Sequence, residues 1–315
     1  MVNIILGLLK LCGGQSLVID SILQWAGRYR YVFKSKDVPV LTREVAMKIW
    51  SDVREGWSAI TATLDMGLTT EVIKYVSNVS CVDIRGECIE LSRLSELKEN
   101  YVYAVLGGDL VPLACYDETL RKYYKLKPLA PDKAPTLEIN GIHMHRCEGI
   151  DPWTDSILKL KQLGGLRRAI VLDTCTGLGY TASIAAGRGA TLVVTSEVDP
   201  NVIKMSAFNP WSRGLASRNI VTIKADVGRA VQEAPDSIFT HILHDPPRFS
   251  VAGELYSREF YKELHRVLKA GGRLFHYTGM PYKHSNVSIL KGIKRRLEEA
   301  GFYVVKWSSS AQGFI

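Results

Sequence analysis

The fold is decided by residues 171–181, which read V-L-D-T-C-T-G-L-G-Y-T. An apolar run ends at Asp173, and a turn through Gly177 and Gly179 then leads into a helical pattern. Glycines let the backbone approach a ligand closely, and the N–H groups that begin a helix attract its anionic or polar atoms. In open α/β sheets such a turn lies at the carboxyl end of a strand, where ligands bind. The stretch therefore predicts an α/β domain with a ligand site after its first strand.

The chemistry of this turn favours a nucleoside that carries an amino acid over a dinucleotide. A dinucleotide site has a third glycine, in the pattern G-x-G-x-x-G, whereas this chain reads G-L-G-Y-T-A from Gly177. Asp173, directly after the strand, suits a bound ammonium group better than a pyrophosphate, because opposite charges attract.

From Asp151 to the carboxyl end, short apolar strands alternate with amphipathic helices. The strands read A-I-V-L-D, T-L-V-V-T-S, I-V-T-I, S-I-F-T-H-I-L, R-L-F-H-Y-T and Y-V-V-K-W, and the remaining residues suffice for a turn and one short antiparallel edge strand. This alternation predicts a mostly parallel sheet with helices on both faces. We place this domain at residues 136–315.

Residues 1–135 predict a small α+β domain. Thr42 caps a predicted helix, and the short alternating runs between residues 58 and 129, rich in Val, Tyr and Ile, predict an antiparallel sheet. Residues 128–135 hold three prolines and are typical of a linker. This domain is a candidate for substrate or RNA recognition.

Acidic residues follow the second and third strands of the larger domain. Glu197 comes 24 residues after Asp173, where a carboxylate accepts the hydrogens of both ribose hydroxyls. NAD enzymes use the same device, so this position does not separate the two kinds of cofactor. Asp226 either accepts a hydrogen from an adenine amino group or caps the next helix, and the two roles are compatible.

The most specific signal in the chain is H-D-P-P-R-F at residues 244–249. Two consecutive prolines fix a rigid turn without N–H groups, which leaves the Asp245 carboxylate and the Pro246 carbonyl as acceptors. That pair suits an exocyclic amine, whose lone pair would then point at an incoming methyl group; a simple turn is the alternative. Asp245 would orient the amine rather than deprotonate it, and an asparagine would be expected to keep partial activity.

Together these motifs resemble those of class I S-adenosylmethionine-dependent methyltransferases. D-P-P is similar to the [DN]-P-P-[YFW] motif of methyltransferases that act on base amines, and T-L-E-I-N-G-I-H-M-H-R, D-P-W-T-D and D-P-P-R-F-S resemble a family of predicted archaeal methyltransferases over about residues 37–315. The resemblance implies a Rossmann-like, seven-stranded domain that holds S-adenosylmethionine. The implied catalytic residues are Asp245, Pro246, Pro247, Arg248 and Phe249. The implied cofactor-binding residues are Asp173, Thr174, Cys175, Thr176, Gly177, Gly179, Tyr180, Thr181, Glu197, Val198, Asp226 and Val227.

The chain departs from this motif at its fourth position, which is Arg248 instead of an aromatic residue. Either Phe249 takes over the stacking on the substrate base, or the guanidinium plane of Arg248 stacks on it.

The net charge of +8 is unevenly distributed. Residues 1–150 hold 18 Lys and Arg against 18 Asp and Glu, so residues 151–315, with 22 against 14, carry all of it. A basic domain of this kind indicates an anionic partner such as RNA, and K-G-I-K-R-R at 291–296 is a candidate phosphate-binding helix face. Solvated surface charge is the alternative.

The function that these patterns favour is N-methylation of an exocyclic amine in an rRNA or tRNA base, cytidine N4 ahead of guanosine N2. The alternatives are a small-molecule amine or polyamine alkyltransferase and a non-catalytic RNA-binding assembly factor. Intact carboxylates at Asp173, Glu197, Asp226 and Asp245 disfavour the assembly factor, and the positive net charge disfavours a polycationic substrate.

Metal binding and export are not predicted. None of the six cysteines forms a C-x-x-C pair, and His143 and His145 lack a third ligand at suitable spacing. Cys81 and Cys88 flank a turn and could meet across a hairpin, but free thiols are favoured in a reducing compartment. The apolar stretch Val2–Cys12 is too short to span a bilayer and lacks the features of a signal peptide, so we expect a buried strand or helix and a cytoplasmic protein.

Overall fold

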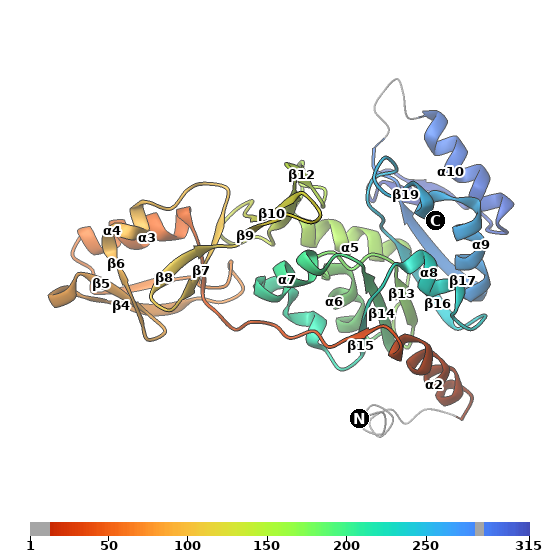
Figure 1. The fold of residues 1–315 in the computed structure, drawn as a ribbon, viewed down its shortest axis with the longest axis horizontal. Helices are drawn as coiled ribbons and strands as arrows, with labels where there is room; N and C mark the ends of the chain where they lie inside the picture. Colours follow the sequence, from red (N-terminus) through yellow and green to blue (C-terminus); the bar gives the residue numbers. More distant parts are fainter. Residues whose placement is uncertain (1–12, 281–286) are drawn as a thin grey trace. The chain divides into compact units, whose positions relative to one another are not determined.

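The computed structural model describes residues 13–280 and 287–315, which form two compact units (Figure 1). The α/β unit comprises the described residues up to Phe33 together with those of 155–200 and 214–315, and the β-rich unit comprises 34–154 and 201–213. The stretch Val2–Cys12 lies outside the described residues. No helix within the described ranges is long and apolar enough to cross a membrane.

The first described residues, 13–33, belong to the α/β unit, not to the smaller domain as predicted. Helix α2 (Gly13–Gly27) buries Trp25 in the core of this unit. The indole Nε1 of Trp25 donates to the Ala230 carbonyl at 2.8 Å, and its ring centroid lies 6.1 Å from that of Phe239. The apolar residues of α2 therefore complete a core that the later strands build.

The prolines at 128–135 also do not separate two domains. Strand β11 (Thr136–Ile139) pairs antiparallel with β10 (Lys122–Lys127), so the proline-rich segment connects two neighbouring strands of one sheet. The expected boundary at residue 135 is replaced by one near residue 154, because the backbone hydrogen bonds of β11 are made within the β-rich unit.

The α/β unit is built on a mixed sheet with the strand order β1-β15-β14-β13-β16-β17-β19-β18 (Figure 1). Neighbouring strands from β15 to β17 in this order are parallel, and the pairings of β1, β18 and β19 are antiparallel. The bounds are β1 Arg30–Tyr31, β13 Ile170–Asp173, β14 Leu192–Glu197, β15 Ile220–Lys224, β16 Phe239–His244, β17 Leu268–Tyr277, β18 Trp307–Ser308 and β19 Gly313–Phe314.

Three details of this sheet differ from the prediction. Of the predicted strand Y-V-V-K-W, only Trp307 lies in a strand, β18. The two-residue strand β1 adds an eighth strand next to β15. The last strand of the chain, β19, lies between β17 and β18 and is not an edge strand. Both segments are too short to show a periodic pattern, so their positions depend on tertiary pairing.

The central strands are apolar because helices cover both faces of the sheet. Every residue of β13 and β14 is buried, as the continuous hydrophobic runs predicted. Helix α9 shows how a helix joins the core: Ser257 caps its first turn, and Phe260, Leu264 and Val267 follow at helical spacing and are buried. The helices are α5 Pro152–Gln162, α6 Tyr180–Gly187, α7 Pro200–Phe208, α8 Val227–Gln232, α9 Arg258–Val267 and α10 Val287–Glu299, with 3-10 turns η2 Pro210–Ala216 and η3 Gly253–Tyr256.

In the described chain, the β-rich unit contains small antiparallel sheets and two α-helices before residue 100, and residues 201–213 add most of α7 to it. As predicted, the Thr42 side chain caps the first of these helices by accepting from the Val45 N–H at 3.3 Å. The sheets have the orders β12-β11-β10-β9, β2-β7-β8 and β3-β4-β5-β6. The remaining bounds are β2 Val40–Thr42, α3 Arg43–Arg54, β3 Ala59–Ala62, β4 Glu71–Val76, η1 Ser77–Val79, β5 Cys81–Ile84, β6 Glu87–Glu90, α4 Leu91–Ser95, β7 Val102–Leu106, β8 Asp109–Pro112, β9 Ala114–Asp117 and β12 Ile142–His143.

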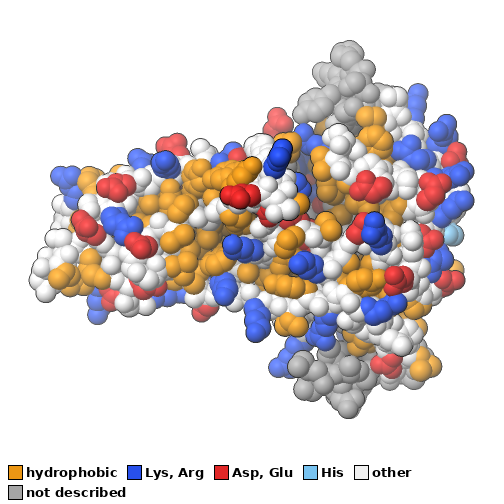
Figure 2. Space-filling model, in the orientation of Figure 1, with side chains coloured by type: hydrophobic (Ala, Val, Ile, Leu, Met, Phe, Trp, Pro, Cys, Tyr) orange, Lys and Arg blue, Asp and Glu red, His pale blue; other side chains and the backbone are white. Residues whose placement is uncertain are grey.

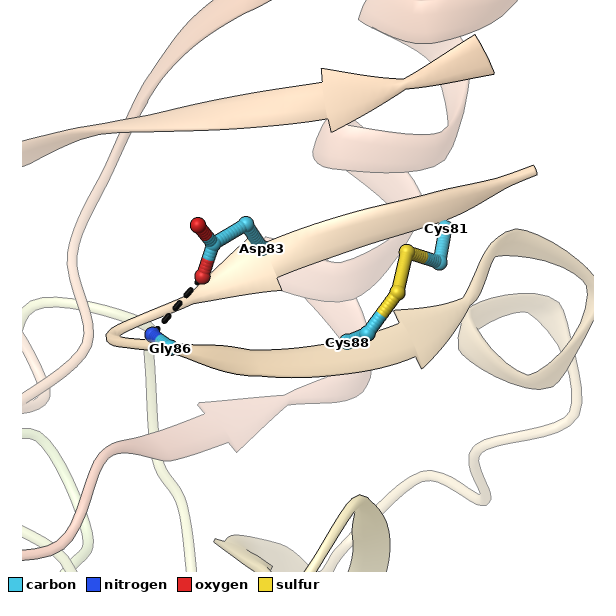
Figure 3. The surroundings of a disulfide bond; sticks show 4 residues. All are labelled: Cys81, Asp83, Gly86 and Cys88. Carbon is cyan, nitrogen blue, oxygen red and sulfur yellow. Dashed lines mark hydrogen bonds between the residues drawn. A yellow bond between two sulfur atoms is a disulfide. The ribbon is translucent and has the colours of Figure 1, made fainter. Parts of the chain in front are cut away.

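A disulfide joins Cys81 and Cys88 across the hairpin of β5 and β6 (Figure 3). The preference for free thiols is therefore wrong for this pair. The register places Cys88 opposite Asp83, and the hairpin turn is closed by the Gly86 N–H donating to the Asp83 carboxylate at 2.7 Å. This leaves the two cysteine Cα atoms 5.5 Å apart, a separation that a disulfide spans without backbone movement.

Candidate active site

Asp173 ends β13 and is almost completely buried, with 1% of its surface exposed. Its Oδ2 accepts hydrogen bonds from the hydroxyls of Thr181, at 2.9 Å, and Thr195, at 3.0 Å. Its Oδ1 is buried and has no hydrogen-bond partner. Burial raises the pKa of Asp173 to about 7, and the two hydroxyl hydrogen bonds oppose the rise. An unpartnered buried oxygen of this kind is suited to a ligand that brings its own N–H donors.

The glycine turn after Asp173 leads into a helix, as the sequence predicted. Gly177 and Gly179 have φ angles of +53° and +76°, in the left-handed region that side chains disfavour. A Cβ atom at Gly179 would also clash with the Leu215 side chain. The turn ends in α6, where Thr181 faces Asp173 but Tyr180 is buried with 2% exposed.

Glu197 ends β14, the neighbour of β13. Its carboxylate binds the backbone of the glycine turn after β13 and the backbone that follows β14. Its Oε1 accepts from the N–H groups of Val198 and Asp199, at 3.0 and 2.9 Å, and its Oε2 accepts from the Gly177 N–H at 3.0 Å. Burial raises the pKa of Glu197 to about 7. A carboxylate accepts about four hydrogen bonds, two at each oxygen. Oε1 already accepts two and Oε2 accepts one, so Oε2 can accept one more. This geometry leaves room for one ligand hydroxyl, where the sequence predicted two.

Asp226 and Val198 are much more exposed than Glu197. The Asp226 side chain caps α8 by accepting from the Gly228 N–H at 2.8 Å, which is one of its two predicted roles. Val227, the first residue of α8, is buried with 6% exposed, whereas Val198 is 63% exposed. Asp173 and Glu197 end the strands β13 and β14, and Asp226 comes just after β15. These three strands are neighbours and run parallel, so the three carboxylates lie along one edge of the sheet.

Asp245 directly follows β16, on the other side of β13, and is bound by a lysine that the sequence did not reveal. Lys159, from α5, is 3% exposed and places its Nζ 2.7 Å from Asp245 Oδ2 and 2.9 Å from Asp155 Oδ2. The same Nζ lies 3.9 Å from the centroid of the Tyr277 ring. Burial opposes the charge on Lys159, but the neighbouring carboxylates outweigh it and raise the pKa of this lysine, which is therefore charged. Asp155 and Lys159 are four residues apart on one helix, but no local pattern indicates the contact to Asp245.

The loop after Asp245 presents the other predicted catalytic residues. Pro246 is buried, whereas Pro247, Arg248 and Phe249 are exposed. The Pro247 carbonyl accepts from the Tyr256 hydroxyl at 2.8 Å, and the rings of Tyr256 and Phe249 meet edge to face at 5.4 Å. Phe249 is 46% exposed and so offers the aromatic surface that the motif lacks at Arg248.

Two buried histidines, His244 and His276, lie next to the start of this loop. His244 Nε2 donates to the Leu255 carbonyl at 2.9 Å, and its Nδ1 accepts from the Thr174 hydroxyl at 2.8 Å. Burial lowers the pKa of His244 to about 3, so the ring is neutral. The ring of His276 lies 4.4 Å away, centroid to centroid. Thr174 thus connects the strand end of β13 to that of β16.

Two other predicted cofactor residues also have structural partners. The Thr176 and Thr195 hydroxyls are 2.8 Å apart, in the hydrogen-bonded network that includes Asp173. Burial raises the pKa of the Cys175 thiol, which leaves it uncharged at neutral pH and unsuited to be a nucleophile.

No group of His, Cys, Asp and Glu suitable for a metal ion occurs among residues 13–280 and 287–315. His143, in the β-rich unit, lies 3.2 Å from Glu138, and His145 lies 3.1 Å from the Thr136 hydroxyl. Both histidines therefore have protein partners.

The basic helix face at 291–296 is partly neutralised. In α10, Lys294 pairs with Glu298 and Arg295 with Glu299, and the Arg296 Nε donates to the Tyr256 carbonyl at 2.8 Å. Arg296 is therefore a structural contact to the loop that holds Phe249, and Lys291, which is exposed, remains a candidate for phosphate contacts beside Lys294 and Arg295.

The fold of the chain is similar to that of spermidine synthase. The chain is similar to a spermidine synthase in complex with the transition-state analogue AdoDATO, with a TM-score of 0.52, 18% identity, and coverage of 64% of this chain and 70% of the other. A spermidine synthase from Thermotoga maritima gives a TM-score of 0.49 at 17% identity, covering 65% of this chain and 70% of the other. At these identities the likeness shows the fold alone, the methyltransferase-like α/β fold that the sequence predicted.

A closer relative defines the family. Uncharacterized protein MJ1233 of Methanocaldococcus jannaschii is 43% identical over 218 residues, which cover 69% of this chain and 73% of the relative. The chain belongs to the same family as this protein. No family model matches the chain.

Proposed function

We propose that the protein is an S-adenosylmethionine-dependent N-methyltransferase that acts on an exocyclic amine of an RNA base. The observation that carries this proposal is the placement of Asp173 and Asp245 after the adjacent parallel strands β13 and β16. Asp173 has a buried oxygen without a partner, and Asp245 is followed by the Pro246 carbonyl in a turn without N–H groups. The first suits the ammonium group of a cofactor, and the second suits a substrate amine.

The residues at this edge fit S-adenosylmethionine. Asp173 Oδ1 would accept from the ammonium group, and the glycine turn would admit the methionine part close to the backbone. Glu197 Oε2 would accept from one ribose hydroxyl, while Asp226, already a helix cap, keeps acceptor capacity for the adenine amine. Thr181 and Thr195 would act indirectly, because they fix the orientation of Asp173. When bound, the cofactor supplies an electrophilic methyl group.

Asp245 and Pro246 would orient the amine for this transfer. An aromatic amine is a weak nucleophile, because its lone pair is delocalised into the ring. If Asp245 Oδ1 and the Pro246 carbonyl accept its two hydrogens, the lone pair is directed at the methyl group, and acceptors held rigidly in this way cost no reorganisation. The amine proton becomes acidic only once the methyl group is on the nitrogen, so it leaves afterwards.

Two contacts favour a base over an alkylamine. Lys159 places a buried cation beside Asp245, and a second cation such as a polyamine would be repelled there. The exposed ring of Phe249 lies beside the D-P-P turn and packs against the buried ring of Tyr256. A planar base would stack on the exposed ring of Phe249. Surface charge adds less, since Lys and Arg side chains are interspersed with Asp and Glu over the face drawn in Figure 2.

A small-molecule amine alkyltransferase is the second candidate. It is favoured by the likeness of the fold to spermidine synthase and by the cluster of carboxylates at Asp155, Asp173, Glu197 and Asp245. Incubation with S-adenosylmethionine labelled in its methyl group, and in parallel with the decarboxylated cofactor labelled in its aminopropyl chain, separates the candidates, with RNA in one reaction and putrescine or spermidine in another. The second label is needed because transfer of a longer alkyl group leaves the methyl group on sulfur. Label in RNA alone supports the base methyltransferase, and label in the polyamine alone supports the alternative.

Replacing Glu197 by alanine is expected to weaken S-adenosylmethionine binding by roughly 1–3 kcal/mol, because a charge-assisted hydrogen bond to the ribose is lost. Titration calorimetry measures this change. Glu233→Ala is a matched control, since Glu233 is an exposed carboxylate paired with Arg28 at 2.8 Å on the surface. Unchanged affinity in Glu197→Ala would remove Glu197 from the cofactor site.

RNA binding is expected to weaken with salt, with part of that dependence due to α10. Reversing both Lys294 and Arg295 to Glu should lower the slope of log K against log salt concentration by roughly 1 to 2. Arg296 is left in place because it holds the Tyr256 carbonyl. If the double variant and the parent bind RNA equally at every salt concentration, this helix face is only solvated.

A further inference from the structure

We infer that Lys159 is a positioning residue for the transfer, which holds Asp245 ionised and occupies its Oδ2 so that Oδ1 alone faces the amine. This inference rests on the proposed function, in which Asp245 must accept a hydrogen. Neither the glycine turn nor the D-P-P motif contains Lys159, which belongs to the helix that precedes the first central strand.

The geometry around Lys159 leaves it little freedom. Its Nζ bridges Asp245 Oδ2, at 2.7 Å, and Asp155 Oδ2, at 2.9 Å, and stands over the Tyr277 ring. Asp155 is 1% exposed and Lys159 is 3% exposed, whereas the Asp245 side chain keeps 21% of its surface exposed. The pair therefore opens toward solvent only on the Asp245 side, where a substrate would arrive.

The charges around Asp245 explain why it needs a cation. Burial raises the pKa of Asp245, and Asp155 raises it further, while Lys159 opposes both effects. The titratable groups that interact with Asp245 are Asp155 and Lys159 on α5, Asp173 at the end of β13, Cys175 just after it and Tyr256 in η3. Lys159 is the cation of this set. Without it, Asp245 would tend to hold a proton at neutral pH and would then offer a donor where the amine requires an acceptor.

Stability alone does not account for this lysine. A buried ion pair is seldom more stable than a well-packed apolar replacement of similar volume, because desolvation offsets the attraction. Asp155 by itself would neutralise Lys159, since the two are four residues apart on α5. The additional bond to Asp245, 86 residues away in the sequence, fixes one oxygen of the residue that would face the substrate.

The protonation state of Asp245 can be tested without any substrate. Infrared difference spectra of Lys159→Met at neutral pH should show a protonated buried carboxyl group, which disappears in Lys159→Met/Asp245→Asn. Lys48→Met is the matched control, because it removes the lysine of an exposed Lys–Asp pair at the same spacing. If Lys159→Met shows no protonated carboxyl that depends on Asp245, the inference is overturned, whatever the fate of the proposed function.

The pH profile of transfer gives the second readout, with RNA from a deletion strain as methyl acceptor. Because the transfer needs the ionised carboxyl, Lys159→Met should lose at least about tenfold in kcat at pH 7 and recover toward high pH, as the Asp245 carboxyl ionises. Lys159→Arg keeps the charge with altered geometry, so its kcat should fall without a shift of the profile. A Lys159→Met profile that matches the wild type contradicts the inference.

A second variant tests the inference if Lys159→Met does not fold. If Lys159→Met leaves too many carboxylates unpaired, Lys159→Met/Asp155→Asn removes one of them and should show the same protonated carboxyl and the same alkaline shift. Absence of methyl transfer in every protein, wild type included, would instead refute the proposed function and leave the infrared result as the test of Lys159.

Discussion

Replacing Asp245 by alanine is expected to abolish methyl transfer, with a loss of about 10²–10³-fold or more, the cost of removing one oriented hydrogen-bonding group from a transition state. Cofactor affinity should change little, because Asp245 contacts the substrate amine in our proposal. The variant also leaves Lys159 with Asp155 as its one carboxylate partner. Thermal unfolding must therefore accompany the kinetics, since removing one partner of a buried pair costs about 3–5 kcal/mol.

Asp245→Asn is the sharper variant, and here the structure changes the expectation from sequence. An amide oxygen could still accept from an amine, which predicts partial activity. Lys159 is a donor, however, and it binds Oδ2 at 2.7 Å, so the amide oxygen of the substituted side chain would turn to Lys159 and its NH₂ group would face the substrate. Two donors then meet, and we expect Asp245→Asn to be within about tenfold of Asp245→Ala. Asp52→Asn, at a partly exposed aspartate in the β-rich unit that pairs with Lys48, is the control. Normal turnover in the Asp245→Ala variant would contradict the proposed mechanism.

Asp173 should make the stability of the free protein depend on pH. Its pKa is about 7 in the folded protein against an ordinary value of 3.8, so the folded state holds a proton that the unfolded state loses. The contribution to the free energy of unfolding is present below about pH 4 and is lost as the pH rises to about 7, a change on the order of 4 kcal/mol. Asp173→Asn lacks this titration and should become more stable relative to the wild type from pH 5 to pH 8. Denaturant unfolding at the two pH values measures the difference.

The same titration predicts how the cofactor binds. An ammonium group requires the ionised carboxylate, so affinity for S-adenosylmethionine should rise as the pH increases through 7, with release of a proton on binding. Calorimetry in buffers of different ionisation enthalpy detects that proton. A wild-type affinity that is flat from pH 6 to pH 8, together with a constant stability difference to Asp173→Asn, would show that this carboxyl is already ionised in the free protein.

The strand ends were predictable because they depend on local patterns. Apolar runs that end in Asp173 and Glu197, and the D-P-P turn after the fourth strand, place those residues at one edge of any parallel sheet. The mixed α/β sheet is confirmed. The capping of α8 by Asp226 was one of two roles that the position allows, and the hydrogen bonds of the folded chain were needed to recognise it.

The features that the sequence missed depend on contacts between distant residues. Lys159 reaches Asp245 across 86 positions, and β1 joins the sheet through two residues that have no pattern of their own. The hairpin that brings Cys81 and Cys88 together was predictable, but spacing does not tell whether the sulfurs are bonded. Helix α2 was missed because its apolar residues, Trp25 among them, pack against a core that is formed by strands much later in the sequence.

The central claim is methyl transfer to an exocyclic amine, and the position of a transferred label tests it most directly. The protein is incubated with S-adenosylmethionine that carries a deuterated methyl group and with total RNA from a deletion strain, and the nucleosides are then analysed by mass spectrometry. We predict the label on an exocyclic nitrogen, cytidine N4 first and guanosine N2 second, in wild type but not in Asp245→Ala. Label on a ribose oxygen or a ring carbon would contradict the account, since neither reaction uses the acceptors that Asp245 and Pro246 provide.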